Sequence, residues 1–101
     1  MKKVVLVCAS GMSTSLLMNK MRKAAKEQNL DVLVEAYPVA EVEQFSSDAD
    51  VVLLGPQIRH RIEDVRNEVS CPVASIDLQV YGRMDGERVI RQVMEILNVQ
   101  K

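Results

Sequence analysis

The chain has 101 residues, 48% of them hydrophobic, which suits a single globular domain over residues 1–101. Its formal net charge is −1, and its 13 lysines and arginines are interspersed among 14 acidic residues, a pattern that argues against nucleic acid as a partner. The long apolar runs have only the length of strands, so we expect no signal peptide, no membrane insertion and a cytoplasmic location.

The first predicted element is a buried strand at residues 4–7, which runs directly into Cys8. The spacing of the apolar residues then changes to that of a helix, predicted over 13–28 and ended by Asn29. One face of this helix is apolar, with Leu17, Met21, Ala24 and Ala25. The opposite face carries Lys20, Lys23 and Lys26.

Three more strands and their helices follow. Residues 31–37 form the second predicted strand, stopped by Pro38, and a short helix is expected through Glu41 and Phe45. A turn at 46–48 leads into the remaining predicted elements. These are a strand at 51–54, a helix marked by Ile58, Ile62, Val65 and Val69, a strand at 73–76, a loop at 77–84, and a last helix marked by Val89, Ile90, Val93, Met94 and Leu97.

Strand and helix thus alternate four times, which predicts a doubly wound, three-layer α/β sandwich around a four-stranded parallel sheet. In such sheets ligands bind beyond the carboxyl ends of the strands. Three segments should meet at that edge: Cys8, residues 55–57, and the loop 77–84.

The segment after Cys8 consists of small and hydroxyl-bearing residues, namely Ala9, Ser10, Gly11, Met12, Ser13, Thr14 and Ser15. A turn from a strand into a helix presents unpaired backbone N–H groups, and the helix dipole adds positive charge, so an anion is favoured there. The same field favours a reactive thiolate. Residue types alone leave a second interpretation equally open, in which Cys8 is a small buried hydrophobe beside an ordinary turn.

Missing residues exclude several chemistries and make others less favoured. There is no GxxxxGK[ST] run and no GxGxxG fingerprint. The first and third strands end in Cys8 and Gly55 rather than in the carboxylates of a phosphoaspartate receiver. A cysteine phosphatase or arsenate reductase needs the arginine of a C-x5-R motif, and Thr14 occupies that position. A non-catalytic anion-binding module stays open beside these enzymes.

Residues 8–17, 50–58 and 81–86 together resemble the enzyme IIB component of the lactose/cellobiose/chitobiose class of the bacterial phosphoenolpyruvate-dependent sugar phosphotransferase system. The resemblance spans essentially the whole chain. It implies the four-stranded parallel sandwich of that family, with flavodoxin-like or phosphotyrosine phosphatase-like topology. It also implies a protein-phosphocysteine-sugar phosphotransferase.

On this resemblance, Cys8 accepts a phosphoryl group from a histidine of the IIA component and gives it to a disaccharide bound by the membrane IIC component. Residues 9–15 would surround the phosphate with backbone amides. No metal and no bound cofactor are implied. We expect a monomer.

The sequence indicates a functional role less strongly for the remaining residues. Gln57 and Tyr81 lie on neighbouring loops and are expected to touch the phosphate or a partner, unless they merely start a helix and anchor a loop. We expect Asp85 to be the N-cap of the last helix. Cys71 is predicted to be structural, and His60 to lie on a solvated helix face between two arginines.

Overall fold

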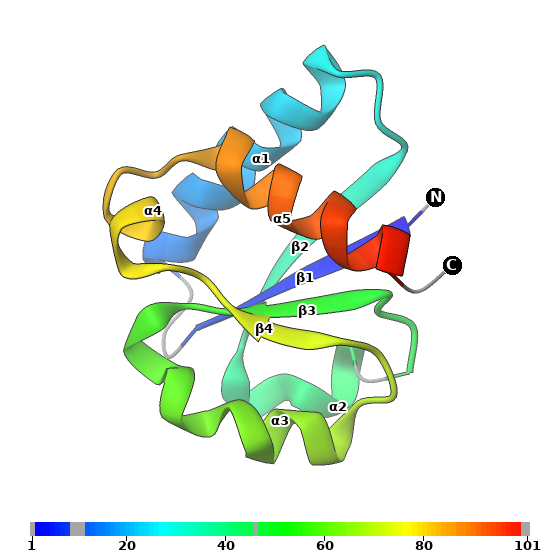
Figure 1. Ribbon diagram of the computed structural model, residues 1–101. Coiled ribbons are helices and arrows are strands. Elements are labelled where there is room, and N and C mark those ends of the chain that lie inside the picture. The colour runs from blue at the N-terminus through cyan, green and yellow to red at the C-terminus, as the bar shows by residue number, and fades with distance from the viewer. Residues whose placement is uncertain (1, 9–11, 46, 100–101) are drawn as a thin grey trace.

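The computed structural model describes residues 2–8, 12–45 and 47–99, with the backbone alone at 12–14, 42, 45 and 99. Four strands form one parallel sheet in the order β2-β1-β3-β4 (Figure 1). Their bounds are Lys2–Cys8 for β1, Val32–Pro38 for β2, Val51–Leu54 for β3 and Val73–Ser75 for β4. The predicted α/β fold class with a four-stranded parallel sheet is confirmed.

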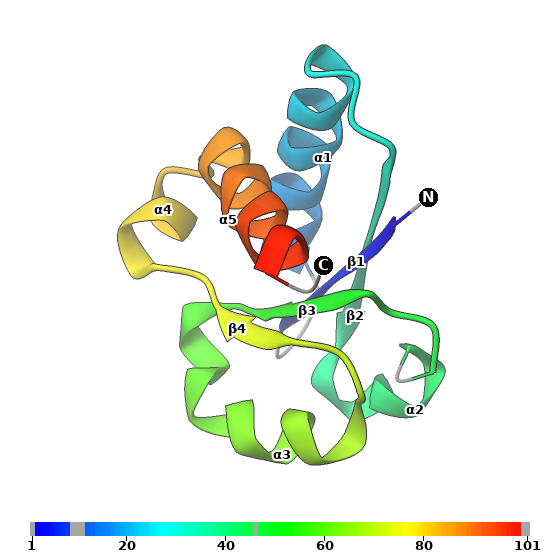
Figure 2. The ribbon, with the colours of Figure 1, turned by 45° about the vertical axis from the view of Figure 1, so that its right-hand side comes forward.

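Helices cover both faces of the sheet, which gives three layers (Figures 1 and 2). The longest two, α1 (Met12–Glu27) and α5 (Gly86–Val99), lie side by side on one face. The opposite face is covered by α2 (Val42–Phe45) and α3 (Ile62–Glu68). The shorter elements are α4 (Leu78–Gly82) and two 3₁₀ helices, η1 (Val39–Glu41) and η2 (Pro56–Arg61).

Strand β1 divides the core into two clusters because successive side chains of a strand point to opposite faces. Val4 and Leu6 pack on the side of α1 and α5, where Met21 and Ile90 are also fully buried. Val5 and Val7 pack on the other side, against a cluster that includes Val65 of α3. Burial on both faces explains why the sequence of β1 is apolar without interruption.

The predicted boundaries of the first helix agree with the structure to within a residue. Its expected apolar positions are all buried, and Asn29 follows the last turn with a φ of 56°. The Leu30 N–H donates to the Ala25 carbonyl at 2.9 Å, as in a left-handed helix C-terminus. Asparagine tolerates this backbone conformation better than most residues, so Asn29 ends the helix as predicted.

Helices α1 and α5 cross where Gly86 begins α5. A Cβ atom on Gly86 would lie 2.5 Å from the carbonyl carbon of Lys20 and 2.7 Å from the backbone nitrogen of Met21. Backbone atoms cannot yield as a flexible side chain can. Glycine at position 86 therefore sets how closely α5 approaches α1.

The second strand ends at Pro38, which is its last residue, one residue beyond the predicted strand at 31–37. The Lys2 N–H donates to the Asp31 carbonyl. The backbone N–H and C=O groups of the odd-numbered residues of β2 therefore point toward β1, and those of the even-numbered residues point away from it. The missing N–H of Pro38 therefore lies on the outer side of an edge strand. No bond of the ladder is lost.

Two expectations about helices are wrong. The segment 77–84 is not simply a loop, because α4 forms within it. The helix expected from Ile58 starts instead as the 3₁₀ helix η2, in which Ile58 itself has non-helical angles (φ −121°, ψ 21°). Regular α-helix begins only at Ile62, and Val69 is extended. The apolar spacing correctly marked the buried face, since Ile58 and Val65 are buried and Ile62 and Val69 pack against the same cluster.

Candidate functional site

Cys8 is the last residue of β1, a central strand of the sheet, and its side chain is only 5% exposed. Helix α1 begins four residues later, at Met12. The predicted phosphate-binding residues Ala9, Ser10 and Gly11 lie outside the described residues. Met12, Ser13 and Thr14 are described by their backbone alone, and Ser15 is exposed. The expected contacts of residues 9–15 with a phosphate therefore stay a prediction.

The amino end of α1 favours an anion near Cys8. The helix has 16 residues, and its first turn contains no acidic side chain that would neutralise the positive end of the helix dipole. Its first amides have no carbonyl partner within the helix. The chain thus brings a thiol and a set of backbone donors to one place at the end of β1.

The end of β3 adjoins the end of β1 through Gly55. The Gly55 N–H donates to the carbonyl of Val7, the residue before Cys8, at 2.9 Å. A Cβ atom on Gly55 would lie 3.1 Å from Gln57 Oε1 and 3.7 Å from Tyr81 Cε2. The structure therefore brings together the two second-loop residues named from the sequence and sets them beside the strand that ends in Cys8.

Tyr81, which lies near Gly55, belongs to α4, and this helix begins directly after Asp77. The Asp77 side chain caps the helix, with Oδ1 accepting from the Gln79 N–H at 2.9 Å and from the Val80 N–H at 3.3 Å. The ring of Tyr81 is 4% exposed, whereas Leu78 on the same helix is 66% exposed. Neither α4 nor the exposed leucine was predicted from the sequence. An N-cap residue at Asp77 before a short apolar run was the available signal.

The remaining candidates lie elsewhere or have structural roles. Cys71 precedes the amino end of β4, whereas Cys8 lies at the carboxyl end of β1. Because the strands are parallel, the two cysteines lie at opposite ends of the strands. Burial raises the pKa of the Cys71 thiol, which disfavours its reactive thiolate. His60 is exposed within η2. Asp85 caps α5, since its Oδ1 accepts from the Arg88 N–H at 3.2 Å, as predicted.

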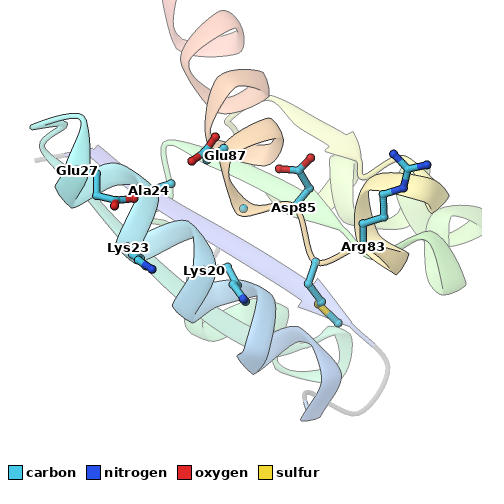
Figure 3. A pocket seen from close by; sticks show the side chains of 9 residues that line it. Lys20, Lys23, Ala24, Glu27, Arg83, Asp85 and Glu87 are labelled. Carbon is cyan, nitrogen blue, oxygen red and sulfur yellow. The ribbon is translucent and has the colours of Figure 1, made fainter.

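A cleft of about 320 Å³ separates α1 from the segment 83–87 (Figure 3). Its charged lining consists of three cations and three anions: Lys20, Lys23, Arg83, Glu27, Asp85 and Glu87. Because these charges balance, the lining of the cleft favours neither an anion nor a cation. Within the described ranges, no group of three or more His, Cys, Asp or Glu side chains is arranged to hold a metal ion.

The sequence model of the lactose/cellobiose-specific IIB subunit of the phosphotransferase system matches residues 3–92. The galactose-specific EIIB component of Lactococcus lactis subsp. cremoris is 36% identical to this chain, over 96% of this chain and 97% of the relative. The chain belongs to the lactose/cellobiose IIB family. Its general activity is therefore that of the sugar-specific IIB component of a sugar phosphotransferase.

Other members of the IIB family support the same fold and length. The oligo-beta-mannoside-specific EIIB component of Bacillus subtilis is 32% identical, over 96% of this chain and 97% of that protein. The solution structure of the cellobiose-specific IIB component from Borrelia burgdorferi superposes with a TM-score of 0.80, at 34% identity, covering 96% of this chain and 92% of that one.

One relative is much longer. The lactose-specific EIICB component of Staphylococcus epidermidis is 26% identical over 94% of this chain, which spans 17% of that protein. Among the residues described for the present chain, no helix is both long and apolar enough to cross a bilayer.

Proposed function

We propose that Cys8 carries a phosphoryl group as a transient phosphocysteine. The observation that carries the proposal is the position of this thiol. It ends a central strand, and the amino end of a 16-residue helix without acidic residues in its first turn follows four residues later. Phosphoryl transfer depends mainly on positioning and on stabilisation of negative charge, and a helix terminus supplies both.

The reaction has two steps. The Cys8 thiolate attacks the phosphorus of a phosphohistidine on the IIA component, so that a sulfur–phosphorus bond forms and the nitrogen–phosphorus bond breaks. A sugar hydroxyl then attacks the same phosphorus, losing its proton, and the thiolate leaves. The backbone amides of residues 9–15 hold the phosphoryl oxygens in both steps.

Gln57 and Tyr81 are proposed to contact the phosphoryl group or the docked partner. Their support is the convergence of both side chains at Gly55, whose amide bonds to the residue before Cys8. Tyr81 is nearly buried, so its ring forms a fixed wall, while the exposed Gln57 has an amide group that can reorient.

The proposed acceptor is a disaccharide of the cellobiose, chitobiose or lactose kind, carried by a membrane IIC component, with this chain acting in the cytoplasm. The longer EIICB relative, whose name joins the IIC and IIB parts, supports a IIC partner. The relatives are named for galactose and for oligo-beta-mannosides, so the sugar differs within one family.

A matched pair of variants tests the proposal. Cys8→Ser should abolish transfer of phosphate from phosphorylated IIA component to sugar in membranes that contain the IIC component, because a serine hydroxyl without a general base is a poor nucleophile at neutral pH. Cys71→Ser should leave transfer intact. Retained transfer in Cys8→Ser would overturn the proposal. Hydrolysis of a chromogenic phosphate ester by the parent protein would favour a phosphatase instead.

A further inference from the structure

Within the described part of the chain, the two outer strands of the sheet, β2 and β4, each have one side without a neighbouring strand. In β2, the hydrogen bond from Lys2 to the Asp31 carbonyl fixes which residues point their backbone groups away from β1. These outward residues are Val32, Val34, Ala36 and Pro38. In β4, the Pro72 carbonyl accepts from Val52, and the Ile76 N–H donates to the Leu54 carbonyl. The outward residues of β4 are therefore Val73 and Ser75.

Three side chains from three different helices bond to these outward backbone groups. Arg22 of α1 donates from Nε and Nη2 to the Val34 carbonyl, at 3.0 and 2.6 Å. At the other edge, Arg66 of α3 donates to the Val73 carbonyl at 3.3 Å and Gln92 of α5 donates to the Ser75 carbonyl at 3.2 Å. Each acceptor is one of the carbonyls that a further strand would use.

We propose that these side chains close both edges of the sheet against strand pairing with a second copy of this chain. An open edge offers unpaired N–H and C=O groups to any neighbouring strand. At β2, Arg22 already donates to the Val34 carbonyl, and Pro38 has no N–H to offer a further strand. Two β2 edges aligned antiparallel about Val34 would also bring two Arg22 guanidinium groups together, and like charges repel.

The edge at β4 is closed in a different way. This strand has only three residues, and both of its outward carbonyls already have a side-chain donor. A second copy would have to displace both donors to gain a very short ladder. Strand β2 is longer, with seven residues. Loss of its side-chain donor, Arg22, should therefore promote pairing with a second copy more than loss of a donor at β4.

The test compares Arg22→Met with Lys23→Met, which removes the adjacent cation of α1 without touching the edge. Light scattering after size exclusion should give twice the monomer mass for Arg22→Met as concentration rises, and the monomer mass for Lys23→Met and the parent. Hydrogen exchange at the outward amides of Val32, Val34 and Ala36 should slow in step with dimer formation. A parent chain that already pairs through β2, or an Arg22→Met variant that folds and stays monomeric at high concentration with unchanged exchange, would overturn the proposal.

A second arm covers the case in which Arg22→Met fails to fold, which circular dichroism would show. Arg22→Lys keeps the charge with a single donor group and should stay monomeric, whereas Arg22→Ala loses both the charge and the donor and should dimerise. Equal masses for these two folded variants would count against the proposal. The mass and hydrogen-exchange measurements need no phosphate on Cys8, so the outcome of this test is independent of the proposed function.

Discussion

The amide of Gly55 donates a hydrogen bond to the carbonyl of Val7 at 2.9 Å, and this bond ties the end of β3 to the residue before Cys8. Gln57 and Tyr81 both lie within 4 Å of the place where a Gly55 Cβ would be. A change at position 55 therefore alters the surroundings of Cys8 without removing any proposed reactive group.

Gly55→Ala should slow phosphoryl transfer while leaving the fold intact. The backbone angles at Gly55, φ −60° and ψ 149°, suit alanine, so the substitution introduces no backbone strain. The new methyl would lie 3.1 Å from Gln57 Oε1, and the Gln57 side chain must shift to relieve this contact. We expect a loss of about 1 kcal/mol of transition-state stabilisation, roughly fivefold in rate, measured by single-turnover transfer from phosphorylated IIA component.

The control is the same substitution in a Gln57→Ala background. If Gly55→Ala acts by displacing Gln57, it should have little further effect once that side chain is gone. An undiminished effect in the double variant would show that Gln57 is not the group through which position 55 acts.

Gly86→Ala should destabilise the protein strongly. The added methyl would meet the backbone of Lys20 at 2.5 Å, so α5 must move away from α1. Overpacking of this kind costs about 1–3 kcal/mol in the free energy of unfolding, measured by urea denaturation. Gly82→Ala is the matched control, since outside its own helix backbone and its chain neighbours no atom of the described residues lies within 4 Å of its Cβ position. Equal stabilities of the two variants would contradict the close crossing of α1 and α5.

The sheet, its core and the position of Cys8 could be predicted because they depend on patterns local in sequence. The central strands β1, from Val4 onward, and β3 are continuous buried apolar runs, and the apolar face of α1 repeats at helical spacing. Nothing local indicates that Gly86 must meet Lys20, or that Gly55 lies against Tyr81, because these contacts join residues distant in the chain. Helix α4 was missed because five residues hold too few turns for a periodic pattern.

Cys71 should react slowly at neutral pH. Burial raises the pKa of its thiol, so its thiolate forms only above the ordinary value of about 8.5. In a Cys8→Ser variant, the rate of alkylation by iodoacetamide should stay low through pH 8.5 and rise at higher pH. A midpoint at or below 8.5 would contradict the expected effect of burial.

The same shift makes a prediction about stability. Because the folded-state pKa of Cys71 is raised, its contribution to stability is fully present below the unfolded-state pKa and is lost as pH rises through the folded value. The parent should therefore lose stability relative to Cys71→Ala as pH rises above about 8.5. Two stability curves that stay parallel over this range would be the contrary result.

Lys3 should stabilise the fold through its two carboxylate partners. Its Nζ lies 2.8 Å from Asp48 Oδ2 and 3.1 Å from Glu35 Oε1, and hydrogen bonds to these groups raise the pKa of Lys3. The stabilisation is complete below the ordinary lysine pKa of about 10.4 and is lost only as pH rises beyond it. Lys3→Met should cost about 0.5–1 kcal/mol in unfolding free energy, since Asp48 is well exposed to solvent.

The neighbouring Lys2→Met is the control for Lys3→Met, because it removes an exposed charge from the same strand. High salt should narrow the difference between the two variants by screening the Lys3 ion pairs. Equal unfolding free energies at low salt would show that these pairs contribute nothing measurable.

The most direct test of the account is to locate the phosphate. The protein would be incubated with phosphorylated IIA component, trapped rapidly, digested and sequenced by mass spectrometry under conditions that keep the sulfur–phosphorus bond. We predict one phosphorylated site, Cys8, which disappears in Cys8→Ser and persists in Cys71→Ser. Phosphate found on His60 or on Cys71, or a Cys8→Ser protein that still accepts phosphate from the IIA component, would contradict the central claim.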